Sequence, residues 1–99
     1  MSVPRTLDLD LLRCFVTIAE TESFTRAGDR LGRTQSTISL QVKRLEEQLG
    51  RAVFDRTPRS LKLTPAGERL LGPARQLLRL NDAAIAQLFA KCSLRPSRW

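Results

Sequence analysis

The sequence contains no histidine, so it lacks both the commonest general base and the commonest metal ligand. Its two cysteines, Cys14 and Cys92, lie far apart and form no CxxC pair, which argues against a disulfide framework or a zinc site. It has no glycine-rich phosphate loop, and no serine or cysteine stands beside a plausible catalytic base. We therefore expect no enzyme activity, no cofactor and no metal.

Long apolar runs are also missing. No segment approaches the roughly 20 residues that a membrane-spanning helix requires. The first ten residues include Asp8 and Asp10 and contain no hydrophobic signal segment. The sequence thus predicts no membrane partner and a cytoplasmic location. Cys14 lies within an apolar helical segment, which favours a packing role over a thiol sensor.

Acidic residues are in the minority. The sequence has seventeen lysines and arginines but only ten aspartates and glutamates, which gives a net charge of +7 in 99 residues. Such an excess favours a polyanionic partner, most often nucleic acid, and the length allows one small domain. A basic soluble protein without such a partner remains an alternative on charge alone.

The most informative segment is 34–50. From Ile38 to Leu49, apolar residues recur at i, i+4, i+7 and i+11, the pattern of a helix with one buried side. The other side of its first half carries hydroxyl and amide side chains, which suits a helix that reads base edges in the major groove. Glu46 and Glu47 near its end would be repelled by phosphates, so only the first two turns should approach DNA.

Two helices are predicted before this one. Thr6 or Asp8 caps the first, which runs to about residue 20, and Ser23 caps a second over 24–31. Gly32 then supplies a left-handed stop, and Thr34 caps the next helix two residues later. Two helices joined by so short a glycine-containing turn indicate a helix-turn-helix whose second member is the recognition helix.

After Gly50 the pattern changes to two short β-prone segments, 53–54 and 61–63, separated by a turn. An isolated hairpin is marginally stable, so this one must lean on the helices. A hairpin in this position is a wing, and Arg56, Arg59 and Lys62 would reach phosphates or the adjacent minor groove. The alternative is a solvated basic turn without a ligand.

A last helix is predicted over 65–90, capped by Thr64 and kinked but continuous through Pro73; two shorter helices are the alternative. Its apolar stripe follows a heptad and is too wide for one small domain to cover, so a second copy of the helix is the simplest partner. Residues 91–99 are expected to form a disordered tail. The predicted dimerisation residues are Leu70, Leu71, Ala74, Leu77, Leu78, Asn81, Ala84, Ile85 and Leu88.

Several spaced motifs, in this order, resemble the N-terminal DNA-binding domain of LysR-type bacterial transcriptional regulators. They include Ser-Phe-Thr-Arg-Ala at 23–27, Gln-Ser-Thr-Ile-Ser at 35–39, Val-Phe-Asp-Arg at 53–56 and Leu-Thr-Pro-Ala-Gly at 63–67. The resemblance covers about residues 9–88. It implies a mainly α fold: a winged helix-turn-helix with a two-stranded β wing over 1–64, and a linker helix over 65–90 that pairs between subunits.

The resemblance also implies a site. Positions matching Gln35, Ser36 and Ser39 face the bases in such proteins, and the position matching Arg56 lies at the minor groove. Family members normally continue into an effector-binding domain of two α/β lobes; these 99 residues contain none of it, so we expect no small-molecule effector site here. The complete predicted DNA-binding set is Arg33, Thr34, Gln35, Ser36, Thr37, Ser39, Leu40, Lys43, Arg56 and Arg59.

We accordingly predict a sequence-specific DNA-binding transcriptional regulator that binds a two-fold related operator in double-stranded DNA as a homodimer. Two alternatives stay open. The chain is an interaction subunit that pairs through its last helix with full-length regulators, or it is the winged-helix domain of another family, such as the molybdate-responsive regulators.

Overall fold

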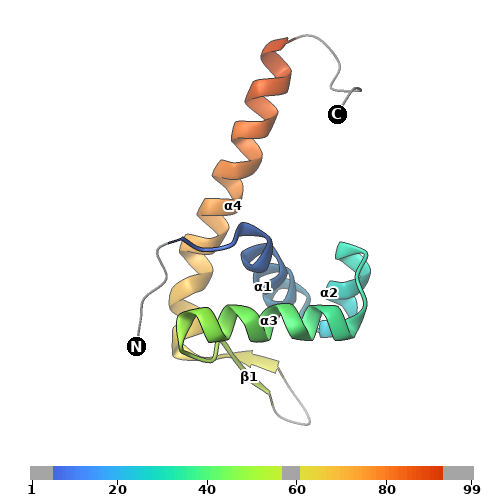
Figure 1. Ribbon diagram of the computed structural model, residues 1–99, viewed down its shortest axis with the longest axis vertical. Helices are drawn as coiled ribbons and strands as arrows, with labels where there is room; N and C mark the ends of the chain where they lie inside the picture. The colour runs from blue at the N-terminus through green and yellow to red at the C-terminus, as the bar shows by residue number, and fades with distance from the viewer. Residues whose placement is uncertain (1–5, 57–60, 93–99) are drawn as a thin grey trace.

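Four helices and one small hairpin make up the computed structural model, which describes residues 6–56 and 61–92. Three helices and the hairpin form a head, and the last helix leaves it as a long arm (Figure 1). The mainly helical winged fold predicted from the sequence is confirmed. The elements are α1 (Leu9–Thr21), α2 (Phe24–Leu31), α3 (Gln35–Leu49), β1 (Phe54–Arg56), β2 (Leu61–Leu63) and α4 (Pro65–Cys92).

Side-chain caps and left-handed glycines set the helix ends, as predicted. Of the two candidate caps for α1, Asp8 is used: its carboxylate accepts from the backbone N–H of Asp10 at 2.8 Å. Ser23 caps α2 in the same way, and the left-handed Gly32 and Gly50, both at φ 69°, close α2 and α3. Because Gly32 ends α2 and Thr34 caps α3 only two residues later, the turn between the two helices is tight.

The wing is an antiparallel pair in which Phe54 lies opposite Leu63 and Arg56 lies opposite Leu61. The first strand was predicted over 53–54, with the turn starting at Asp55; the strand instead covers Phe54–Arg56, because Asp55 and Arg56 pair with Lys62 and Leu61. The rest of the predicted turn, with Pro58 and Arg59, falls outside the described residues. Glu46 anchors the start of the wing to α3, because its Oε2 accepts from the backbone N–H of Val53 at 2.9 Å. A residue expected only to repel phosphates thus also joins two elements.

The core lies between α1, the buried sides of α2 and α3, the first half of α4 and the base of the wing. The ring of Phe54 stands 5.3 Å from that of Phe15 and 6.1 Å from that of Phe24, centroid to centroid, so the hairpin leans on the helices as expected. The buried apolar residues are Leu11, Leu12, Cys14, Phe15, Val16, Ile18, Ala27, Ile38, Val42, Leu45, Val53, Phe54, Ala74 and Leu78.

Helix α4 is continuous through Pro73, so the alternative of two shorter helices is wrong. It also runs to Cys92, two residues into the predicted tail, because adding a residue to an existing helix needs no new nucleation; 93–99 lie outside the described residues. Within the described part of the chain, no helix combines the length and apolarity needed to cross a membrane.

The apolar stripe of α4 is divided, which corrects part of the predicted dimer seam. Ala74 and Leu78 are buried in the chain's own core, because this part of α4 packs on α1. Leu70 and Leu71 are half-buried against the same core. The remaining large apolar side chains of the predicted set are exposed: Leu77, Ile85 and Leu88.

Candidate nucleic-acid interface

Helix α3 presents an outward strip, defined here as Ser36, Leu40 and Lys43, on the side opposite its buried stripe. All three side chains are exposed, whereas Ile38 and Val42 are at most 1% exposed. The strip lies on one line because residues three or four apart share a helix face. In Figure 1, α3 crosses the lower part of the head and the wing is drawn below it; the hydrogen bond from the backbone N–H of Val53 to Glu46 links the two elements.

The first turn of α3 is held by hydroxyl groups. Thr34 caps the helix by accepting from the backbone N–H of Thr37 at 3.1 Å, and its hydroxyl also donates to the hydroxyl of Thr37 at 2.9 Å. Gln35 is exposed, and its Oε1 accepts a hydrogen bond from the hydroxyl of Thr25 at 3.3 Å. Sequence reasoning missed Thr25, because only the folded α2–α3 turn brings it beside Gln35.

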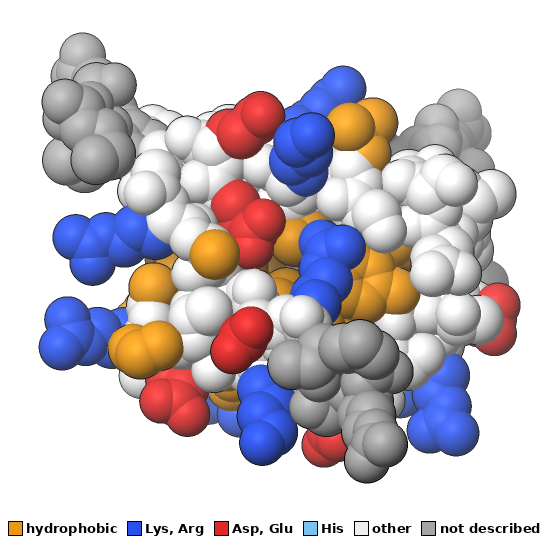
Figure 2. All heavy atoms as spheres, turned by 90° about the horizontal axis from the view of Figure 1, so that it is seen from below, with side chains coloured by type: hydrophobic (Ala, Val, Ile, Leu, Met, Phe, Trp, Pro, Cys, Tyr) orange, Lys and Arg blue, Asp and Glu red, His pale blue; other side chains and the backbone are white. Residues whose placement is uncertain are grey.

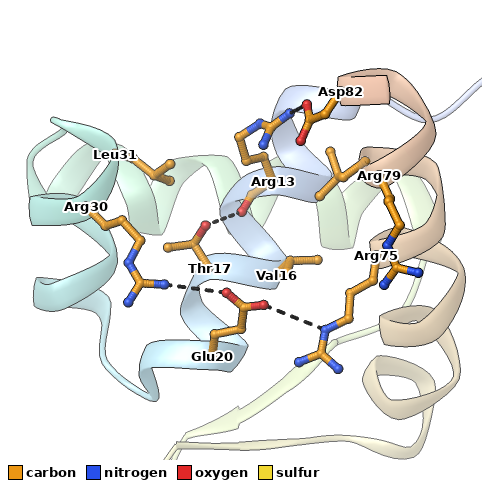
Figure 3. Close-up of a pocket in the computed structure, with 10 residues that line it drawn as sticks. Arg13, Val16, Thr17, Glu20, Arg30, Leu31, Arg75, Arg79 and Asp82 are labelled. Carbon is orange, nitrogen blue, oxygen red and sulfur yellow. Dashed lines mark hydrogen bonds and ion pairs between the residues drawn. The ribbon is translucent and has the colours of Figure 1, made fainter. Parts of the chain in front are cut away.

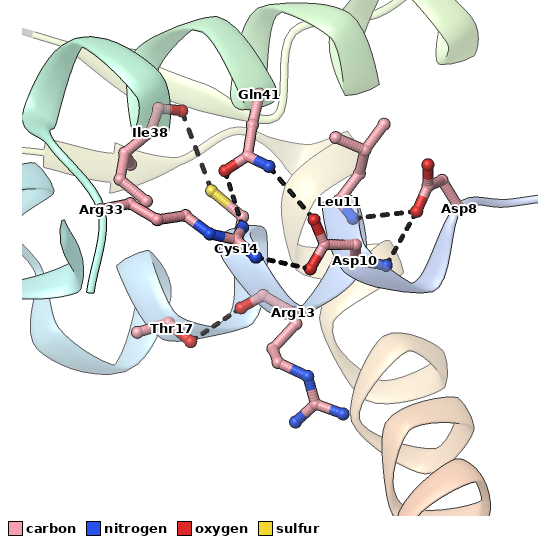
Figure 4. A network of polar contacts seen from close by, with 9 residues as sticks. All are labelled: Asp8, Asp10, Leu11, Arg13, Cys14, Thr17, Arg33, Ile38 and Gln41. Carbon is pink, nitrogen blue, oxygen red and sulfur yellow. Dashed lines mark hydrogen bonds and ion pairs between the residues drawn. The ribbon is translucent and has the colours of Figure 1, made fainter. Parts of the chain in front are cut away.

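Arg33 points back toward α1 and forms a closed ring of hydrogen bonds with Asp10 and Gln41, shown in Figure 4. Its Nη2 donates to Asp10 Oδ1 at 2.9 Å and its Nη1 donates to Gln41 Oε1 at 2.9 Å. Gln41 Nε2 closes the ring by donating to Asp10 Oδ2 at 3.2 Å. The predicted phosphate ligand Arg33 is therefore engaged in joining α3 to α1.

The ring keeps both of its charged groups ionised. The hydrogen bond from Arg33, assisted by its positive charge, lowers the pKa of the Asp10 carboxyl below its usual 3.8. The same hydrogen bond raises the pKa of the Arg33 guanidinium further above its usual value. Half of the Asp10 side chain is exposed, so the pair is a surface contact that orients α3 more than it stabilises the fold.

Arg56 is positioned by an aromatic ring. Its guanidinium carbon lies 4.6 Å from the ring centroid of Phe24, a cation–π contact between the end of β1 and the start of α2. Phe24 packs in turn against Phe54. The stack positions the guanidinium of Arg56 on the ring of Phe24. Arg56 was predicted from the sequence, but the positioning role of Phe24 was not. Arg59 lies outside the described residues.

Figure 2 shows the side of the molecule that carries α3 and the wing. Lysine and arginine side chains lie around its edge and one lies near its middle, with acidic side chains between them. The positive charge is therefore spread over this side rather than gathered in one patch. Such a distribution suits several separate phosphate contacts along a backbone.

A hollow of about 680 Å³ lies between α1, α2 and α4 and is shown in Figure 3. Its charged groups largely pair with one another. Glu20 binds Arg30 of α2 at 3.5 Å and Arg75 of α4 at 3.8 Å, while Arg13 binds Asp82 at 2.9 Å. These ion pairs connect α1 to α2 and to α4, so the side chains around the hollow help to hold the three helices together.

The one cysteine whose side chain the structure describes is Cys14. Cys14 is fully buried, and burial raises the pKa of its thiol to about 11, so the predicted packing role is confirmed. Among the described residues, no three histidine, cysteine or acidic side chains gather in a way that would hold a metal ion.

The chain matches the family model described as "Bacterial regulatory helix-turn-helix protein, lysR family" over residues 9–68. The chain belongs to the LysR family. It is 51% identical over 84 residues to the HTH-type transcriptional regulator DgdR of Burkholderia cepacia, covering 85% of this chain and 29% of DgdR. It is 49% identical over 82 residues to the HTH-type transcriptional activator AllS of Klebsiella pneumoniae, covering 83% and 30%.

A solved LysR-family domain has the same fold. The BenM DNA-binding domain, in its complex with benA site 1 DNA, superposes with a TM-score of 0.80 and 35% identity over 90% of this chain and 100% of that one. The chain spans under a third of the length of DgdR and AllS. It therefore carries a LysR-type DNA-binding transcriptional regulator domain, and its relatives are regulators, not enzymes.

Proposed function

We propose that this chain binds double-stranded DNA sequence-specifically, with the first two turns of α3 in the major groove. The observation that carries the proposal is the exposed, mostly polar outward strip of α3, which starts beside the exposed amide of Gln35. Side chains of this kind at the start of a recognition helix match the donors and acceptors of base edges. The BenM domain in its DNA complex supports the proposal by its likeness in fold.

The wing is proposed to contact phosphates or the minor groove through Arg56. Its cation–π contact with Phe24 limits the conformations of a long side chain and so reduces the entropy lost on binding. Lys43 is the proposed phosphate contact on α3, because it is exposed at the end of the outward strip. Contacts of this kind position a protein on DNA, and the bases supply the specificity.

Dimerisation is proposed to use the exposed stripe of α4, defined by Leu77, Ile85 and Leu88, which are 40–60% exposed. Two copies of this stripe would cover each other, and Asn81 would favour one register. A two-fold dimer presents two recognition helices to two related half-sites. The same stripe also fits the α4 of a full-length relative, which is the alternative role in mixed dimers.

The proposal is tested by comparing Gln35→Ala with Lys43→Ala on one preferred duplex and on random duplexes. Gln35→Ala should lose about 1–3 kcal/mol on the preferred duplex and little on random DNA, because a glutamine amide pairs bidentately with adenine. Lys43→Ala should weaken both alike and reduce the salt slope by about one. Equal losses for Gln35→Ala on both kinds of duplex would contradict its role in reading bases.

A further inference from the structure

Leu40 is a large apolar side chain in the middle of the outward strip of α3. It is 50% exposed, and the strip residues on either side of it, Ser36 and Lys43, are polar and also exposed. The other exposed large apolar side chains of the described chain are on α1 or α4, namely Leu9, Leu77, Leu80, Ile85 and Leu88. Leu40 is thus the one such residue that would face a bound base pair.

The apolar side chain of Leu40 restricts which groups of a base it can contact favourably. It neither donates nor accepts a hydrogen bond, so pressing it on a polar base edge would remove water from a donor or acceptor without replacing it. The only apolar group on the floor of the major groove is the C5-methyl of thymine. A contact between the two buries apolar surface on both sides and leaves no polar group unpaired.

We propose that Leu40 packs against the C5-methyl of a thymine and so selects an A·T pair at one position of each half-site. The inference rests on the proposed DNA-reading function of α3 and specifies it further. Gln35 at the start of the helix reads by hydrogen bonding, and Leu40 reads by shape and apolarity. The preferred site therefore contains a thymine whose methyl group, not its hydrogen-bonding edge, is recognised.

Deoxyuridine tests this directly, because it differs from thymidine only by lacking the methyl group. Each thymine of a preferred duplex is replaced in turn, and binding of residues 1–99 is measured by fluorescence anisotropy. At one position per half-site the unmodified protein should bind about fourfold more weakly, the equivalent of ~0.8 kcal/mol for one lost methyl contact. In Leu40→Ala the same replacement should change the affinity by less than about 1.5-fold, since the partner of the methyl is gone.

Ser36→Ala is the matched control, because it changes the neighbouring strip residue and should keep the fourfold effect of deoxyuridine. Leu40 is exposed and Leu40→Ala should fold normally, which its thermal unfolding will confirm. A deoxyuridine effect that persists in Leu40→Ala would overturn the inference, as would a sequence-specific protein indifferent to every thymine methyl. A protein that prefers no duplex at all would instead contradict the proposed function itself.

Discussion

At the scale of single residues, the ring formed by Asp10, Arg33 and Gln41 shows how a charged side chain acquires its role from the fold. Arg33 precedes the recognition helix, where a cation would serve DNA binding, yet its guanidinium donates to both other members of the ring. Asp10 lies 23 residues away in sequence, on α1. The ring therefore fixes α3 relative to α1.

This arrangement predicts a pH-dependent difference between the unmodified protein and Asp10→Asn. A lowered carboxyl pKa means that the contribution to stability is present above the usual value of 3.8 and is lost as the pH falls through the lowered value. At pH 7, Asp10→Asn should lower the free energy of unfolding by about 0.2–1 kcal/mol, as for an exposed ion pair. As the pH falls through the lowered pKa, the free energies of unfolding of the two proteins should converge, and thermal unfolding measured from pH 7 into the acid range checks this.

Asp29→Asn, which removes an exposed aspartate from α2, is the control for the general effect of acid on the fold. Its free energy of unfolding should stay close to that of the unmodified protein throughout the pH range. A difference between Asp10→Asn and the unmodified protein that persists unchanged at pH 2.5 would show that the carboxylate charge is not what the ring requires.

At the scale of elements, α4 has two halves with different surroundings. In its first half, Ala74 and Leu78 complete the core, and the ion pair between Glu20 and Arg75 adds a link to α1. In its second half the large apolar side chains of Leu80, Ile85 and Leu88 are exposed. The heptad pattern in the sequence cannot distinguish the halves, because periodicity reveals that a face is buried but not against what.

The start of α4 packs tightly on the base of the wing. A Cβ on Gly67 would overlap the carbonyl oxygen of Val53 and lie 3.0 Å from Leu63 Cδ2. Thr64 fixes this junction, since its backbone N–H donates to that same carbonyl at 3.1 Å. Gly67→Ala should therefore lower the free energy of unfolding by about 1–3 kcal/mol, measured by urea denaturation, despite the better helix propensity of alanine.

Gly72→Ala supplies the matched control, because a Cβ there meets nothing within 4 Å outside its own helix. The change in its free energy of unfolding should stay below about 1 kcal/mol, since the gain in helix propensity is opposed by crowding against the ring of Pro73. If Gly67→Ala proved as stable as Gly72→Ala, the close approach of α4 to the wing would be wrong.

At the scale of the whole molecule, much of the fold follows from local rules. Asp8, Ser23, Thr34, Gly32 and Gly50 set helix ends through interactions with residues close in sequence, so their roles were predictable. The hairpin was also predictable, because alternation and turn residues are local signals.

What escaped prediction depends on contacts between distant segments. The ring around Arg33, the stacking of Arg56 on Phe24 and the bond between Thr25 and Gln35 each join different elements. The residues of α3 that we propose as base contacts could be predicted because an exposed face opposite an apolar stripe is itself periodic. Residues that position them were missed because they carry no periodic signal.

We propose that this chain reads DNA as a two-fold dimer, and a selection from random duplexes distinguishes such a reader from a non-specific binder. Residues 1–99 are mixed with a pool of random duplexes, and binding is measured by fluorescence anisotropy at low and at physiological salt. The duplexes that remain bound at the higher salt are then sequenced. Non-specific electrostatic binding falls steeply with salt, so retained duplexes report specific contacts. Ile85→Asp, which places a charge on the exposed stripe of α4, serves as the control for dimerisation.

We expect enrichment of a motif whose two halves are related by two-fold symmetry, with an A·T pair at one fixed position of each half. Ile85→Asp should recover only a single half, or bind too weakly for enrichment, because its copies no longer pair. Binding that disappears at physiological salt and leaves no enriched sequence would contradict the claim.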